Sequence, residues 1–179
     1  MGEEGKVVGH LLKWAREQQE LTMRDVQLRG GPAPGYQSEV ENGQKGEVSA
    51  EKLYAWCRTL TVTPAFARGQ VPRLEPTTPG RCRGLAGWIE PEVRQNLPEF
   101  EALLPIERFQ RVLKMIATSA ELPIVVLAYV MAMDVSALKN LLYEDARSLY
   151  ITEVQLKQVA VLTAMPTRFF KLGKLCEDD

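Results

Sequence analysis

Apolar residues recur at helical spacing in two stretches of the chain, Lys6 to Ala67 and Pro105 to Phe170. Near the start, four of them follow the three- and four-residue spacing of one face of a helix: Val8, Leu11, Leu12 and Ala15. This pattern predicts a first helix that ends in the polar residues "REQQE". Helical patterning in both stretches predicts an all-α fold.

Capping residues predict where the next helix lies. Thr22 offers an N-cap oxygen to "MRDVQLR", and Asp25 three residues later completes an acidic variant of the capping box. Gly30 and Gly31 follow and end this helix.

A third helix is predicted to begin within "PAPGYQ", because Pro32 and Pro34 suit only an entry or a first helical turn. It continues to Asn42 and stops at Gly43. Ser49 caps a fourth helix, "AEKLYAWCRTL", and "TVTP" closes this unit.

The middle of the chain is rich in helix-breaking residues: Pro72, Pro76, Pro79, Gly80, Gly84, Gly87, Pro91 and Pro98. This composition predicts a linker over residues 69–100, with one short helix near "PEVRQNL". The expected organisation is therefore a domain over 1–68, the linker, and a second helical domain over 101–179.

The two patterned stretches resemble each other. A shift of 101 residues places "LLKW" on "VLKM" and "ELT" on "ELP", and a shift of 103 places "VSAEKL" on "ITEVQL". Identities are few, but the apolar spacing agrees in each helix, which favours a duplication. The alternative is that any two four-helix stretches can be slid into partial register.

Charge restricts nucleic-acid binding to a local surface. The formal net charge is −1 and the pI is about 6.0. Residues 1–70 contain nine Lys and Arg against nine Asp and Glu, and residues 99–179 contain nine against eleven. Neither half has the basic excess that attracts a polyanion from a distance.

Cysteine usage and the absence of a leader favour the cytoplasm. Cys57, Cys82 and Cys176 are widely spaced, with no C-x-x-C pair and a single histidine, so no metal site is expected. Cys82, between two arginines, is either an oxidant-sensitive thiolate or an inert thiol.

The amino terminus lacks a signal peptide, and "LPIVVLAYVMAM" is shorter than the roughly 20 residues that cross a bilayer, so no membrane association is expected.

Catalysis has little support. His10 is the single histidine, and the sequence contains no nucleophile elbow, phosphate-binding glycine loop, or zinc or calcium motif. We expect no enzyme and no cofactor.

The order of these elements resembles the Cro and phage-repressor (XRE) helix-turn-helix family. The resemblance is carried by "LLKWAREQQELTMRDV", "YQSEVENG" and "SAEKLYAWCRTLTVTPAF". It implies two small four- to five-helix domains of lambda-repressor-like type, the second a degenerate copy. In this family the second and third helices form the DNA-reading pair, with the start of the third helix in the major groove.

The resemblance also implies an ion pair between Arg16 and Glu41, because the family has an arginine and a glutamate at these places. A guanidinium can hold a carboxylate with two parallel hydrogen bonds and so join the third helix to the first. The equivalent residues of the second copy are Ala117 and Leu142, so both partners are apolar together. Such joint replacement avoids a stranded buried charge. It indicates a copy that keeps the fold but not the function.

The groove-facing positions carried over from the family fall on Ala33, Pro34, Gly35 and Glu39, with Tyr36, Gln37 and Ser38 nearby. None of the first four is a usual reader of guanine or adenine, although Glu39 can accept a hydrogen bond from cytosine. A shift of the helix by one residue would make Gln37 the best adenine reader. In the alternative interpretation, Gln37 lies at a normally apolar position and covers the edge of the core.

Four cations flank the motif and could contact phosphates: Arg24, Arg29, Lys45 and Lys52. Four contacts support at most weak nonspecific binding, so tight binding would require a dimer. The alternative is that these charges form an ordinary solvated face.

The second helix of the second copy is apolar around much of its circumference, at Val125, Val126, Tyr129 and Val130. Such a helix must be covered, and a second chain or a partner protein is one cover. Burial beneath the linker, at Trp88 and Ile89, is the other.

We therefore expect a transcriptional regulator, most simply a repressor, that binds double-stranded DNA as a homodimer formed through its C-terminal copy. The competing hypothesis is a protein-interaction module, such as an antitoxin or adaptor, on a helix-turn-helix scaffold that no longer reads DNA.

Overall fold

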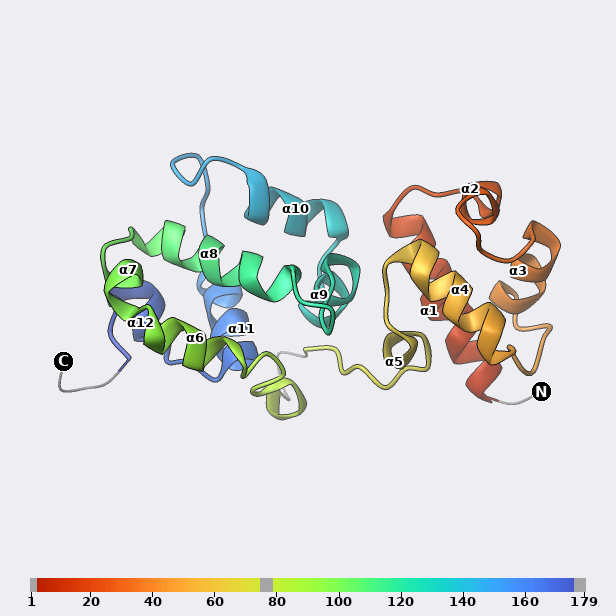
Figure 1. Cartoon of the computed structure of the whole chain (residues 1–179), viewed down its shortest axis with the longest axis horizontal. Coiled ribbons are helices and arrows are strands. Elements are labelled where there is room, and N and C mark those ends of the chain that lie inside the picture. The colour runs from red at the N-terminus through yellow and green to blue at the C-terminus, as the bar shows by residue number, and fades with distance from the viewer. Residues whose placement is uncertain (1–2, 75–78, 176–179) are drawn as a thin grey trace.

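The computed structural model describes residues 3–74 and 79–175, and these residues form helices joined by turns and loops, without strands (Figure 1). The expectation of an all-α fold is confirmed for this part of the chain. The first five helices, which we call the first copy, are α1 (Glu3–Gln18), α2 (Met23–Leu28), α3 (Pro34–Glu41), α4 (Ala50–Leu60) and α5 (Pro64–Ala67).

The caps predicted for the first copy are present. The hydroxyl of Thr22 accepts a hydrogen bond from the Asp25 amide, and the Asp25 carboxylate accepts one from the Thr22 amide at 2.8 Å. Pro34 occupies the first turn of α3, and the Ser49 side chain caps α4. Each cap satisfies an amide that has no partner within its helix.

The rest of the chain forms a short 3₁₀ turn and seven helices in the described ranges: η1 (Pro79–Cys82), α6 (Ile89–Gln95), α7 (Leu97–Glu101), α8 (Pro105–Ala117), α9 (Ile124–Val130), α10 (Val135–Tyr143), α11 (Glu153–Thr163) and α12 (Thr167–Leu172). The helices α8 to α12 are called the second copy. Helices α9 and α10 begin 101 residues after α2 and α3, and helices α11 and α12 begin 103 residues after α4 and α5. These are the shifts that the sequence comparison predicts.

Residues 79–101 do not form the linker that the sequence predicts. Five of their apolar side chains are buried: Cys82, Ala86, Ile89, Val93 and Phe100. The amides of Gly84 and Ala86 donate to the carbonyls of Val161 and Leu162 at 2.8 and 2.7 Å, so this segment is fixed to α11. Within the described chain, the connection between the copies is therefore confined to residues 69–74, and residues 75–78 lie outside the description.

The linker prediction is wrong because the prolines in this segment lie in first turns of helices, where they do not interrupt the helix. Pro91 is in the first turn of α6 and Pro98 in the first turn of α7. Proline is tolerated there, since the amide it removes has no intrahelical acceptor.

A buried arginine joins these added helices to the second copy. The Arg108 side chain is 3% exposed, and its guanidinium donates only to backbone carbonyls, those of Phe100, Glu101, Leu103, Phe169 and Phe170. Most of these carbonyls end α7 or α12, where helices leave acceptors unsatisfied and a cation is favoured. Burial lowers the pKa of this guanidinium from its ordinary value.

Within the described residues, no single helix is long and apolar enough to cross a bilayer; α9 and α10 have the required length and apolar composition only when taken together, as a pair bent by 110°.

Candidate nucleic-acid interface

Helix α3 crosses α1 in close contact. Gly9 on α1 makes this possible, because a Cβ atom at that position would overlap the carbonyl oxygen of Val40. Gly5, one turn earlier, has the same relation to the carbonyls of the loop at Lys45 and Gly46. The first helix therefore supports both α3 and the loop that follows it, without side chains between them.

The predicted ion pair between Arg16 and Glu41 is confirmed. Arg16 donates from Nε and Nη2 to the two carboxylate oxygens of Glu41, at 2.9 and 2.8 Å, and from Nη1 to the carbonyl of Leu21 at 2.9 Å. The Glu41 side chain is 2% exposed. The hydrogen bond to Glu41 raises the pKa of Arg16 above its ordinary value. In the second copy, Leu142 is fully buried at the place of Glu41.

The start of α3 is open to solvent. Ala33, Gly35 and Glu39 are exposed, and Pro34, Tyr36 and Ser38 are half-buried. A Cβ atom at Gly35 would meet no other atom within 4 Å. Figure 1 shows α3 on the side of the first copy that faces away from the second copy. This surface is free to approach a large ligand.

Gln37 is not a base reader in this structure. Its side chain is fully buried, and Nε2 donates to the carbonyls of Met23 and Pro32 at 2.7 and 2.6 Å. The adenine-reader hypothesis for Gln37 is therefore wrong, and the interpretation that it covers the core edge is correct. Its side chain holds the turn between α2 and α3 closed. The second copy has the buried Leu138 at this place.

The flanking cations fall into two groups. Arg24 and Arg29 are exposed at α2 and just beyond its end. Lys45 forms an ion pair with Glu39 at 3.0 Å, and its Nζ lies 4.5 Å from the centroid of the Tyr36 ring. An exposed pair of this kind contributes about 1 kcal/mol or less, so Lys45 could exchange Glu39 for a phosphate.

Lys52 joins the same cluster, with its Nζ 4.0 Å from the centroid of the Tyr36 ring. Two lysines close to one aromatic ring form a small positive flank beside α3.

The apolar surface of α9 is covered within the chain. Val125, Val126 and Val130 are buried, and α9 packs on α8 and α10. The assignment of these three residues to a dimer or partner contact is therefore wrong. An all-apolar circumference requires cover, and the neighbouring helices provide it.

Tyr129, the fourth residue of the predicted dimer or partner contact, lies instead at the junction of the copies. Its ring packs edge-on against Trp14 and Phe66 of the first copy, with centroids 5.4 and 5.1 Å apart. Leu74 adds a hydrogen bond from its amide to the carbonyl of Val130. The copies therefore share an apolar junction that the sequence did not reveal.

The start of α10, which corresponds in sequence to α3, faces this junction. The amide of Val135 donates to Oε1 of Gln18 at 2.9 Å, so a side chain of α1 caps α10. Gln18 also donates to Asp134, the counterpart of Ala33. A DNA groove could not reach this helix start without separating the copies.

No family model, curated protein or solved structure matches this chain.

The two thiols in the described residues are buried. Burial raises the pKa of Cys57 to about 11 and also raises the pKa of Cys82. Both remain protonated at neutral pH, which suits the inert rather than the oxidant-sensitive interpretation of Cys82.

Proposed function

We propose that the chain is a sequence-specific DNA-binding transcriptional regulator, most simply a repressor, acting in the cytoplasm. The first copy would bind DNA through a lambda-repressor-like arrangement in which the start of α3 enters the major groove. One observation carries this proposal: an outward-facing helix start is held by the bidentate pair of Arg16 and Glu41, whose carboxylate is buried.

The exposed side chains define what α3 could recognise. Ala33 offers a methyl group that suits the thymine methyl, and Glu39 can accept a hydrogen bond from the amino group of cytosine. Gly35 presents no side chain, so the backbone at the helix start can approach the bases closely. Amides at this end of α3 lack intrahelical acceptors and are suited to a phosphate.

Arg24 and Arg29 would bind phosphates beside the groove, since both are exposed next to the turn between α2 and α3. Lys45 and Lys52 would do so on the opposite flank, next to Tyr36. Binding of this kind weakens steeply with salt, because each neutralised phosphate releases counterions.

A dimer fits this proposal, because two first copies would double the few cations available and read two half-sites. The α9 residues cannot form the dimer contact, so another surface of the second copy would be required. The second copy would serve as a rigid support for the first and not as a second reader.

A protein-interaction module remains the second candidate, and the observation that favours it is the ion pair of Glu39 with Lys45. It puts an acid at the centre of the exposed face of α3. None of the exposed residues Ala33, Gly35 and Glu39 is a usual reader of purines.

Selection of bound sites from random duplex DNA separates the two candidates. A regulator should enrich one motif, and a mobility shift with that motif should weaken between low and raised salt. The variant Arg24→Ala/Arg29→Ala should reduce binding at least tenfold, whereas Lys139→Ala/Arg147→Ala, which removes two exposed cations of the second copy, should not. No enrichment and no shift at low salt, from a chain that is folded by circular dichroism, would favour the interaction module.

A further inference from the structure

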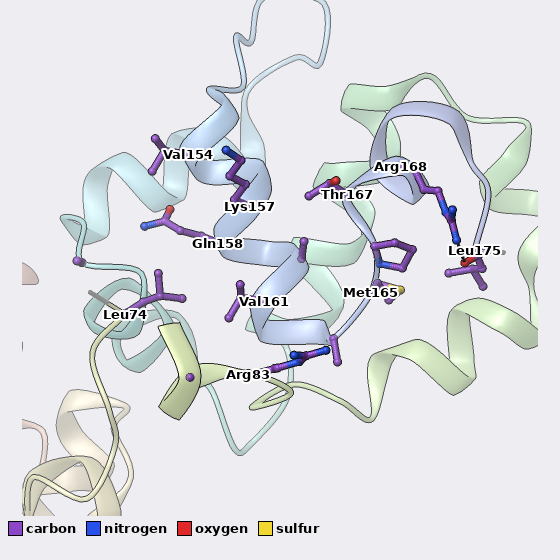
Figure 2. A pocket seen from close by; sticks show the side chains of 15 residues that line it. Leu74, Arg83, Val154, Lys157, Gln158, Val161, Met165, Thr167, Arg168 and Leu175 are labelled. Atoms are coloured by element: carbon purple, nitrogen blue, oxygen red, sulfur yellow. Dashed lines mark hydrogen bonds between the residues drawn. The ribbon is translucent and has the colours of Figure 1, made fainter. Parts of the chain in front are cut away.

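An open groove of roughly 1060 Å³ lies along the outer face of α11 and the turn into α12 (Figure 2). Apolar side chains form most of its floor: Leu74, Val154, Val161, Met165 and Leu175. Its volume slightly exceeds the upper end of the roughly 300–1,000 Å³ that small-molecule sites occupy. The groove lies in the second copy, apart from the exposed start of α3.

Two positions on α11 are apolar where the corresponding positions on α4 are charged. With the shift of 103 residues, Val154 and Val161 correspond to Glu51 and Arg58, which are exposed on α4 of the first copy. Val161 is half-buried and packs against the core, whereas Val154 is 65% exposed. The exposed Val154 contributes little to the core, so a ligand is a better reason for a valine at this position.

Among the residues that the structure describes, cations line the groove and acids do not. Arg83, Lys157 and Arg168 are among these described lining residues, which include no aspartate or glutamate, in a chain whose formal net charge is −1. Figure 2 shows Lys157 and Arg83 at two ends of the apolar surface, with Val161 between them. A groove with this lining attracts anions and repels cations.

Two of these cations are available to a ligand. Across residues 3–74 and 79–175, neither Arg83 nor Lys157 forms an ion pair, and both side chains are exposed. Glu153 lies one turn from Lys157, but Lys171 holds its carboxylate at 2.8 Å and lowers its pKa. An anionic head group could therefore bind Lys157 or Arg83 without first displacing a carboxylate of the protein.

We propose that this groove binds a small amphipathic anion, a molecule with an apolar body and a carboxylate or similar head group. The apolar body covers Val154, Val161 and Met165, and the head group binds Arg83 or Lys157. A ligand that is only apolar leaves the cations unused, and one that is only charged leaves the valines in water.

Isothermal titration calorimetry with decanoate, below its micelle concentration, tests the proposal on the full chain. Decanoate should bind at one site, at least tenfold more tightly than 1-decanol or decyltrimethylammonium, which share its chain length. Binding should weaken at least tenfold in Arg83→Gln/Lys157→Gln and in Val154→Glu. The matched control Lys139→Gln/Arg147→Gln removes two exposed charges elsewhere in the second copy and should leave binding unchanged.

All substituted side chains are exposed, so the variants should fold, and circular dichroism verifies this. Absence of decanoate binding, equal binding of the three probes, or equal weakening by the control variant overturns the proposal. So does a wild-type chain that light scattering shows to be dimeric but that Val154→Glu makes monomeric, because the groove would then be an interface between copies of the chain. None of these outcomes depends on whether the first copy binds DNA.

Discussion

The ion pair of Arg16 with Glu41 gives the sharpest prediction about the first copy. The change Arg16→Ala removes both hydrogen bonds to the carboxylate and the one to the Leu21 carbonyl. Glu41, whose side chain is 2% exposed in the intact pair, then has lost the cation beside it. Breaking a buried pair on one side destabilises a protein by about 3–5 kcal/mol. We expect a loss of this size in the free energy of unfolding.

The residues at the equivalent positions of the second copy suggest a second substitution that should restore the lost stability. Ala117 and Leu142 stand at these two positions, and Leu142 is fully buried. The double variant Arg16→Ala/Glu41→Leu copies this pair and leaves no buried charge, so it should lie within about 2 kcal/mol of the wild type. The coupling energy of the double-mutant cycle should therefore exceed about 3 kcal/mol.

Urea unfolding followed by circular dichroism and tryptophan fluorescence measures these differences. A loss of 3–5 kcal/mol moves the unfolding midpoint by more than about 1 M, because slopes for small proteins are about 1–3 kcal/mol/M. Arg16→Lys is a useful control, since it keeps the charge but loses the bidentate geometry, and it should give an intermediate loss. The reasoning is refuted if Arg16→Ala loses less than about 1 kcal/mol, or if the double variant loses the sum of the two single losses.

Three further predictions concern stability. Gly9→Ala should destabilise the chain by more than about 3 kcal/mol, because the added methyl group overlaps the carbonyl of Val40. Gly35→Ala should be neutral or stabilising by up to about 1 kcal/mol. Thermal melts compare the two variants, and equal effects would contradict the close crossing of α1 and α3. Arg108→Met should lower the free energy of unfolding by about 3–5 kcal/mol, because it removes the hydrogen bonds that the guanidinium donates to five carbonyls, those of Leu103 and Phe170 among them. Arg108→Lys should restore only part of this loss, and urea unfolding midpoints measure both variants. Burial raises the pKa of the Cys57 thiol from 9.0 to about 11. The contribution of this thiol to the free energy of unfolding is therefore complete below pH 9. It is lost between pH 9 and about 11, because in this range the thiol ionises in the unfolded chain but not in the folded one. The loss should be at most about 3 kcal/mol and should disappear in Cys57→Ala; a pH profile that is the same in both proteins would contradict it.

Local chemistry in the sequence predicted the boundaries of the first copy well. Thr22, Ser49 and Pro34 act within one turn of their own positions, so their roles can be interpreted without the tertiary structure. The contact of Arg16 with Glu41 spans 25 residues. It was found only because the resemblance to a known family supplied the pairing.

The sequence does not predict features that depend on contacts between residues far apart in the chain. Gln37 lies at an apolar position of the helical pattern, but the two carbonyls that bind its amide come from residues 5 and 14 positions away. The cover of α9 was expected, but a helical pattern does not tell which surface provides it. The cap that Gln18 places on Val135 joins residues 117 positions apart, and no local signal marks it.

The most direct test of the central claim is the effect of one bulky acid at Gly35 on binding to the selected DNA. Gly35→Glu adds a side chain where no atom lies within 4 Å, so the fold should persist, while the acid would point at the groove. The matched control Ser136→Glu introduces the same acid at the equivalent exposed position of α10. Fluorescence anisotropy with a labelled duplex should show at least a hundredfold loss of affinity for Gly35→Glu and no loss for Ser136→Glu. Unchanged affinity in Gly35→Glu would show that α3 does not enter the groove.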